Sequence, residues 1–112
     1  GDPYMDVALM LMFWGEYRTQ QPPAFTALQS VSRRSGVISR RELAGRWSES
    51  VGRPLHHMNF YMALAFWRLA AIIEGAYGLF TAGQLTTDYA RGLEYDVPAL
   101  LAEAERAAKG DW

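Results

Sequence analysis

The sequence predicts an all-α domain of about four principal helices arranged around one central helix. The first observation is that 58–80 is the longest apolar run in the chain. The second is that three other segments begin with helix-start signals, at Asp2-Pro3, at Ser39 to Glu42 and at Asp96-Val97-Pro98. At 112 residues, we expect 1–112 to form a single domain.

The central helix is predicted from its apolar periodicity. Its large side chains fall on two rows, Phe60, Leu64 and Trp67 on one and Phe66, Ile73, Tyr77 and Phe80 on the other. A helix that is apolar nearly all round is either a buried core helix or a membrane span. Arg68 and Glu74 favour the core helix, since each would cost about 2.5 to 3.5 kcal/mol in the middle of a lone span.

The first helix is expected to begin at Asp2 and Pro3. Asp2 can accept a bond from a free amide of the first turn, and proline is tolerated at the first helical position. Asp6 adds negative charge near the positive end of the helix dipole. Only Asp6 is polar from Met5 to Trp14, a run too short to cross a bilayer, so we expect a second buried helix.

The segment 15–36 is predicted to be a long connection, because Gln20-Gln21-Pro22-Pro23 breaks any helix and Ser30 to Gly36 lacks periodicity. A connection of this length is either a binding edge or a peripheral excursion, and both interpretations stay open.

The next helix is predicted by a capping box, in which Ser39 and Glu42 each satisfy a backbone amide at the helix start. Gly52 and Pro54 supply its end. An apolar stripe is expected to lie on the core, and the charged side chains are expected to face water. The stripe is Leu43, Ala44, Trp47 and Val51, and the charged residues are Arg40, Arg41, Arg46 and Glu49.

The last helix is expected to begin at Asp96 and to end at Gly110, after an irregular segment with a short helical turn at 88–91. Its predicted buried stripe is Val97, Leu101, Ala104 and Ala108, with Glu103, Glu105 and Arg106 outside. Because this alanine-rich face is thin, we expect the helix to dock lightly and to fray at its end.

Composition excludes several classes of function. The net charge of -1 argues against a nucleic-acid or membrane-surface binder, and the lack of cysteine excludes disulfides and thiol catalysis. We see no signal or transit peptide and therefore expect a cytoplasmic protein. The chain carries no complete catalytic motif, and adjacent His56 and His57 lack the spacing of a metal pair, so we predict neither a catalytic residue nor a metal site in this chain.

Several motifs together resemble one family of enzymes. The opening Gly1-Asp2-Pro3-Tyr4-Met5-Asp6-Val7-Ala8 resembles the GDPxxDLA segment of aminoglycoside phosphotransferase-like kinases, especially the branch related to kinase modules attached to acyl-CoA dehydrogenases. The resemblance continues over nearly the whole chain, in order and spacing. It includes Ser39 to Leu43, Val51 to Leu55, Asn59-Phe60-Tyr61, Phe66 to Ala70, Glu74 to Tyr77 and Ala82-Gly83.

This resemblance implies that the chain is the helical C-terminal subdomain of a protein-kinase-like fold. The nucleotide lobe, the catalytic loop and the magnesium ligands would precede Gly1, and the full-length enzyme would use ATP and Mg to phosphorylate a small-molecule hydroxyl. Asp6 matches the aspartate that holds the catalytic loop in shape, and a carboxylate can satisfy two amide donors of such a loop. Without the loop, Asp6 would lack its partner.

The acceptor-substrate side would involve the polar and amphipathic residues of the central helix. The candidates are Trp67, Arg68, Glu74 and Tyr77, and core packing is an equally good interpretation of Trp67 and Tyr77. Relatives often carry an Arg where this chain has Leu79, which puts an anion contact there in doubt.

The alternative function is a self-contained helical ligand-binding or interaction module. A kinase fragment should expose an apolar face and form a homodimer or larger assembly through it, whereas a finished module should not.

Overall fold

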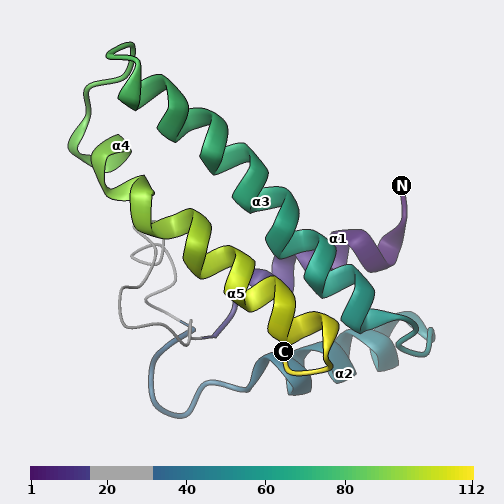
Figure 1. Cartoon of the computed structure of the whole chain (residues 1–112). Coiled ribbons are helices and arrows are strands. Elements are labelled where there is room, and N and C mark those ends of the chain that lie inside the picture. The colour runs from purple at the N-terminus through teal and green to yellow at the C-terminus, as the bar shows by residue number, and fades with distance from the viewer. Residues whose placement is uncertain (16–31) are drawn as a thin grey trace.

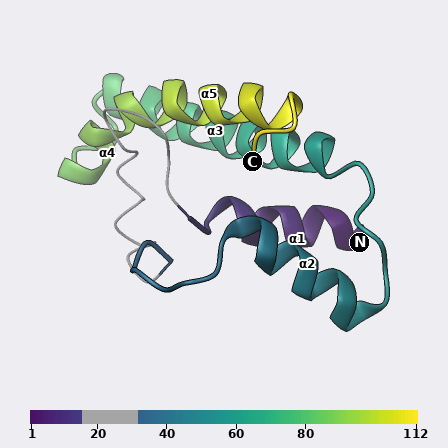
Figure 2. The same cartoon turned by 90° about the horizontal axis from the view of Figure 1, so that it is seen from below.

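The chain folds into two layers of helices. In one layer α3 (Met58–Thr81) lies beside α5 (Asp96–Ala108), and in the other α1 (Pro3–Met12) lies beside α2 (Arg40–Val51) (Figures 1 and 2). The short helix α4 (Asp88–Gly92) and the 3-10 helix η2 (Leu93–Tyr95) lead from α3 into α5. This computed structural model describes residues 1–15 and 32–112, and those ranges contain no strand, which confirms the all-α prediction.

The helix starts follow the predicted capping signals. Asp2 Oδ1 accepts a hydrogen bond from the Tyr4 amide at 2.9 Å, with Pro3 at the first helical position. The Ser39 hydroxyl accepts from the Glu42 amide at 3.1 Å, and the Glu42 carboxylate accepts from the Ser39 amide at 2.9 Å, so the capping box is complete. The predicted turn near Asp88 is α4, which Thr87 caps.

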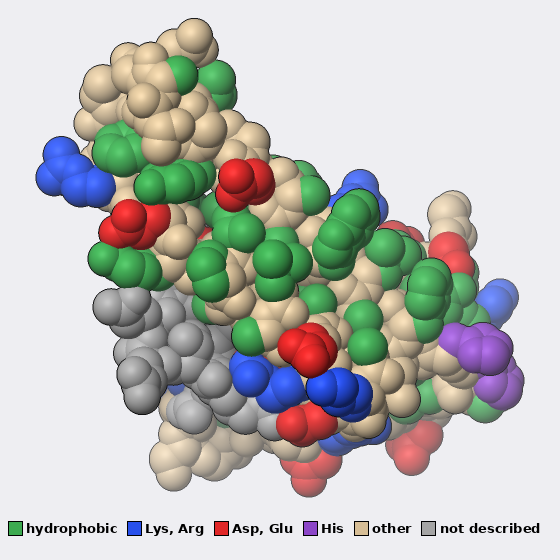
Figure 3. Space-filling view, viewed as in Figure 1, with side chains coloured by type: hydrophobic (Ala, Val, Ile, Leu, Met, Phe, Trp, Pro, Cys, Tyr) green, Lys and Arg blue, Asp and Glu red, His purple; other side chains and the backbone are tan. Residues whose placement is uncertain are grey.

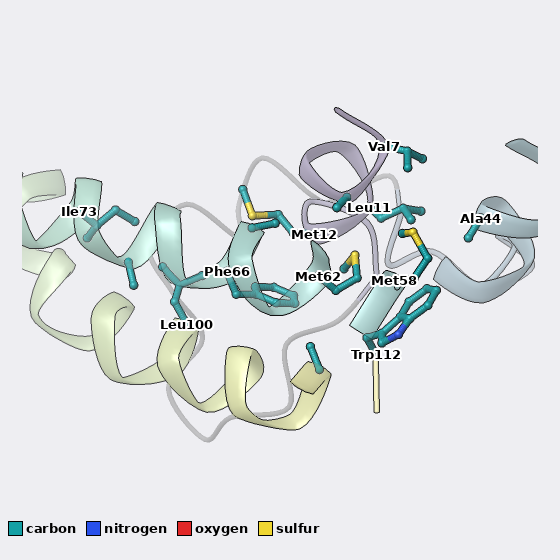
Figure 4. Packing of buried hydrophobic residues seen from close by; sticks show 14 of the residues in the cluster. Val7, Leu11, Met12, Ala44, Met58, Met62, Phe66, Ile73, Leu100 and Trp112 are labelled. Atoms are coloured by element: carbon teal, nitrogen blue, oxygen red, sulfur yellow. The ribbon is translucent and has the colours of Figure 1, made fainter. Parts of the chain in front are cut away.

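The hydrophobic core lies between the two layers, where α1 meets the inner side of α3 and α5 (Figure 4). Phe66 and Met62 of α3 are fully buried there, as are Leu11 of α1 and Leu100 of α5. This places α3 at the centre of the fold, as its length and apolar content predict.

One of the two predicted rows of α3 is not buried. Phe60 is 61% exposed and Trp67 is 57% exposed, so the expectation that this row packs in the core is wrong. The reason is that α1 and α5 cover only part of the circumference of α3. In the second predicted row Phe66 and Ile73 are buried, whereas Tyr77 and Phe80 are only partly buried, so the prediction is confirmed for the first two residues of that row.

The buried face of α5 also differs from the prediction. It consists of Asp96, Ala99, Leu100, Glu103 and Ala107. Glu103 is 1% exposed and pairs with Arg106, whereas Leu101 is 44% exposed and points outward. Small side chains let two helices approach closely. The alanine-rich face of α5 therefore packs along α3, and the expectation that this helix docks lightly is wrong.

The end of α5 is held in place where fraying was expected. Trp112 is buried, and its Nε1 donates a hydrogen bond to Asn59 Oδ1 at 2.8 Å. The Arg41 guanidinium lies 3.7 Å from the centroid of the Trp112 ring and donates to the Trp112 and Gly110 carbonyls. Arg40 likewise donates to the Trp14 carbonyl at 2.8 Å, so these two arginines bind other segments of the chain, contrary to our expectation for α2.

The predicted long connection falls mostly on 16–31, which lies outside the described residues. Within the described ranges, α3 is the one helix long and apolar enough to cross a membrane, with 22% of its most apolar window buried. A central core helix passes the same test of length and composition, so this finding is weak evidence for a span.

Candidate functional site

A hollow between α1 and α2 contains Asp6, the residue to which the family resemblance gives an anchoring role. Asp6 is exposed there, and within the described part of the chain its carboxylate has no hydrogen bond or ion pair. The hollow has a volume of about 380 Å³. Its lining consists of Pro3, Asp6, Val7, Met10, Trp47, Val51 and Arg53.

The position of Asp6 follows from how the start of α1 is attached to the rest of the fold. The Tyr61 hydroxyl of α3 donates to Asp2 Oδ2 at 2.6 Å, and the Tyr4 hydroxyl donates to the Pro54 carbonyl at 2.9 Å. The rings of Tyr4 and Tyr61 stack with centroids 5.6 Å apart. Asp6 lies one turn after Asp2, so these contacts hold its backbone while its side chain faces the hollow.

The Asp2–Tyr61 pair also changes the acid–base properties of both groups. The hydrogen bond from Tyr61 lowers the pKa of Asp2, and the same bond to Asp2 raises the pKa of Tyr61. The pair is therefore formed when Asp2 is ionised and Tyr61 keeps its proton.

The four acceptor-side candidates of α3 do not share one pocket. Trp67 and Glu74 line a shallow hollow of about 180 Å³ together with Leu101 of α5. Arg68 is exposed and lies outside that hollow. The Tyr77 hydroxyl lies 3.5 Å from Glu94 Oε2, and its ring stacks on Phe80 at 6.0 Å, so it belongs to the junction of α3 with η2.

The sequence did not reveal a strongly apolar pocket at the far end of the core. It has a volume of about 320 Å³ and is lined by Phe13, Leu69, Ile72, Ile73, Ala76, Tyr89 and Leu93. These residues come from α3, from η2, from α4 and from the end of α1. Periodicity within one helix cannot indicate such a pocket, because it reports only residues of the same face.

Another hollow, of about 650 Å³, lies at the start of α3 beside Trp112. Arg41, His57 and Asn59 are among its polar lining residues, and His57 precedes α3 in the left-handed conformation at φ 53°. Its strongest donor, Arg41, is already bound to the C-terminal segment. No group of three or more His, Asp or Glu side chains within 1–15 and 32–112 is arranged to hold a metal ion.

Comparison with known proteins adds no match. No protein-family model, no curated protein and no solved structure is significantly similar to the chain. The resemblance to aminoglycoside phosphotransferase-like kinases therefore depends on the motifs of the sequence itself.

Proposed function

We propose that the chain is the acceptor-side helical part of an ATP-dependent small-molecule phosphotransferase, in which Asp6 holds the catalytic loop. The observation that carries the proposal is the Asp6 carboxylate, which is exposed in a hollow lined mainly by apolar side chains together with Arg53, and which stands at the aspartate position of the GDPxxDLA-like motif. An acid in this position at the start of a helix, with its acceptor oxygens accessible, is suited to bind backbone amides of a second segment.

The surroundings of Asp6 favour a protein segment as its partner. Met10 is 44% exposed and Val51 is 46% exposed on the rim of the same hollow. Apolar side chains next to an accessible carboxylate give a surface on which a polypeptide can both pack and hydrogen-bond. Arg53 adds a cation at the edge of this surface.

In this proposal the chain contributes position, and the chemistry is supplied by the other part of the enzyme. Phosphoryl transfer depends on alignment and on electrostatic stabilisation by Mg²⁺ and cationic groups around the transferred phosphate. In the kinases that the motifs resemble, the metal ligands precede the GDPxxDLA segment, so ATP and Mg would be held by a part of the enzyme that precedes Gly1. Asp6 would bind the catalytic loop of that part of the enzyme. The contacts of Tyr4 and Tyr61 would hold α1, and with it Asp6, in place.

The acceptor candidates Trp67 and Glu74 lie on the α3–α5 layer, whereas Asp6 lies on the α1–α2 layer (Figure 2), so an acceptor bound by them has to extend around the subdomain to reach a phosphate beside the loop at Asp6. Trp67 offers an exposed indole and Glu74 a nearby carboxylate in one hollow, which suits a cationic or amphipathic hydroxyl compound. Acceptor contacts by Arg68 and Tyr77 remain predictions from the sequence, because these side chains lie outside that hollow.

The test uses the longer chain that the proposal requires, assayed with Mg-ATP and a panel of small hydroxyl compounds. We expect Asp6→Asn to lower kcat at least 100-fold, because the amide has one uncharged acceptor oxygen where the carboxylate has two charged ones, and its NH2 group would face the backbone amides as a second donor. Asp88→Asn is the matched control, since the Asp88 side chain is 98% exposed in α4, and its activity should stay within a factor of two. Equal activity of both variants would contradict the role of Asp6.

A second candidate function is favoured by the apolar pocket that includes Ile72 and Tyr89. Its volume of about 320 Å³ lies at the lower end of the range for small-molecule sites, so a self-contained module could bind an apolar ligand there. Titration with the anionic fluorescent dye 1-anilinonaphthalene-8-sulfonate, whose aromatic rings bind apolar pockets, tests this function. Ile72→Ser should weaken binding at least tenfold and Leu79→Ser, outside the pocket, should not; equal binding by both would exclude the pocket.

A further inference from the structure

The outer side of α3 divides into a bulky half and a small half. Phe60, Leu64 and Trp67 follow one another at helical spacing on this side, and they are followed at the same spacing by Ala71, Gly75 and Gly78. Phe60 and Trp67 each expose more than half of their surface. A Cβ atom added to Gly75 or Gly78 would meet nothing within 4 Å, so the second half of this face is open.

We propose that two copies of the chain pair through this face with their α3 helices antiparallel and a two-fold axis beside Ala71. In such a pair, two residues lie opposite each other when they are equally far before and after Ala71. Trp67 of one copy then lies over Gly75 of the other, and Leu64 over Gly78. A parallel pair would instead place Trp67 against Trp67 and leave glycine opposite glycine, so the shape of the face is complementary to itself only in the antiparallel arrangement.

The available area approaches what a specific dimer requires. With 24 and 13 residues, α3 and α5 are about 36 Å and about 20 Å long, and at about 10 Å of width each the face spans on the order of 560 Å². A standard interface buries about 800 Å² on each partner. Hydrophobic side chains are spread over the face that α3 and α5 present in Figure 3, and Leu101 of α5, 44% exposed, extends it beside Trp67.

This dimer does not depend on the proposed phosphotransferase function. It uses the same face as the predicted acceptor contacts of Trp67 and Glu74, so the two roles exclude each other in one copy at one time. The α1–α2 hollow around Asp6 lies in the other layer and stays accessible in the pair.

Cysteine cross-linking tests the arrangement directly, because the chain has no cysteine of its own. We expect Ala71→Cys, on the two-fold axis, to form a disulfide-linked dimer under mild oxidation. Ala82→Cys, exposed at the end of α3, is the matched control and should stay reduced, since its two copies lie at opposite ends of the pair. Cross-linking of both variants would indicate a parallel pair, and a monomeric unmodified chain at 100 μM by sedimentation would exclude any pair; either result overturns the proposal.

Discussion

Phe66 and Phe60 are two phenylalanines on one helix in opposite environments. Phe66 is fully buried between α1 and α5, whereas Phe60 is 61% exposed near the start of α3. Their hydrophobicity is identical, so only the packing of neighbouring helices distinguishes them. Comparing substitutions at these two positions therefore gives the contribution of core packing to the free energy of unfolding, with the residue type held constant.

We predict that Phe66→Ala lowers the free energy of unfolding by about 3 to 5 kcal/mol, because it removes a buried ring and leaves a cavity. Phe60→Ala is the matched control and should change the stability of the monomer by less than about 1 kcal/mol. Urea denaturation at a concentration below dimer formation compares the two. Equal losses for the two variants would show that α3 is oriented differently about its own axis.

The Asp2–Tyr61 hydrogen bond predicts a dependence of stability on pH. Because the folded pKa of Asp2 is lowered, its contribution is present above the unfolded value of 3.8 and is lost as pH falls through the folded pKa. Because the folded pKa of Tyr61 is raised, its contribution is present below the unfolded value of 10.0 and is lost as pH rises through the folded pKa.

Tyr61→Phe tests this pair by thermal unfolding across pH. The variant should have a lower Tm than the wild type between about pH 5 and 9, where Asp2 is ionised and Tyr61 is protonated. The difference should narrow below the folded pKa of Asp2 and above that of Tyr61. A difference in Tm that is constant from pH 2 to 11 would mean that Tyr61 acts through packing alone.

Among the helices, α2 has the start that the sequence predicts most directly, because both bonds of its capping box are formed. Ser39→Ala should destabilise the chain by about 1 kcal/mol, because the Glu42 amide loses its acceptor. For a chain of this size that corresponds to a fall in Tm of roughly 4 to 8 °C by calorimetry. Ser50→Ala, exposed within the same helix, is the control and should leave Tm unchanged or slightly raised.

Helix starts were predictable, whereas the buried faces of the helices were predicted only in part. Asp2 and Ser39 signal helix starts through capping bonds within a few residues, which the sequence records directly. The last helix does begin at Asp96, but it follows η2 directly and its N-cap residue, Tyr95, makes no side-chain capping bond. Which side of α5 is buried depends on how α3 lies beside it, and Leu101 and Glu103 exchanged their expected positions for this reason. A buried glutamate opposes the usual pattern of hydrophobicity, so periodicity alone assigns it to the surface.

For the molecule as a whole, two layers leave two faces uncovered. The α1–α2 layer presents the Asp6 hollow, and the α3–α5 layer presents Phe60, Trp67 and Leu101. The motifs gave Asp6 and the acceptor candidates their predicted roles one residue at a time, without the distances between them. They did not predict that Trp67 and Glu74 share a hollow while Tyr77 lies beside Glu94, because these relations depend on the placement of α5 and η2.

The central claim is that Asp6 serves a catalytic loop encoded before Gly1. The most direct measurement is to sequence the encoding reading frame upstream of the Gly1 codon. The account predicts a nucleotide-binding lobe followed by a catalytic aspartate and a metal-binding acidic motif, all in frame with the GDPxxDLA-like helix. A start codon immediately before Gly1 would contradict it and would leave the self-contained binding module as the function of the chain.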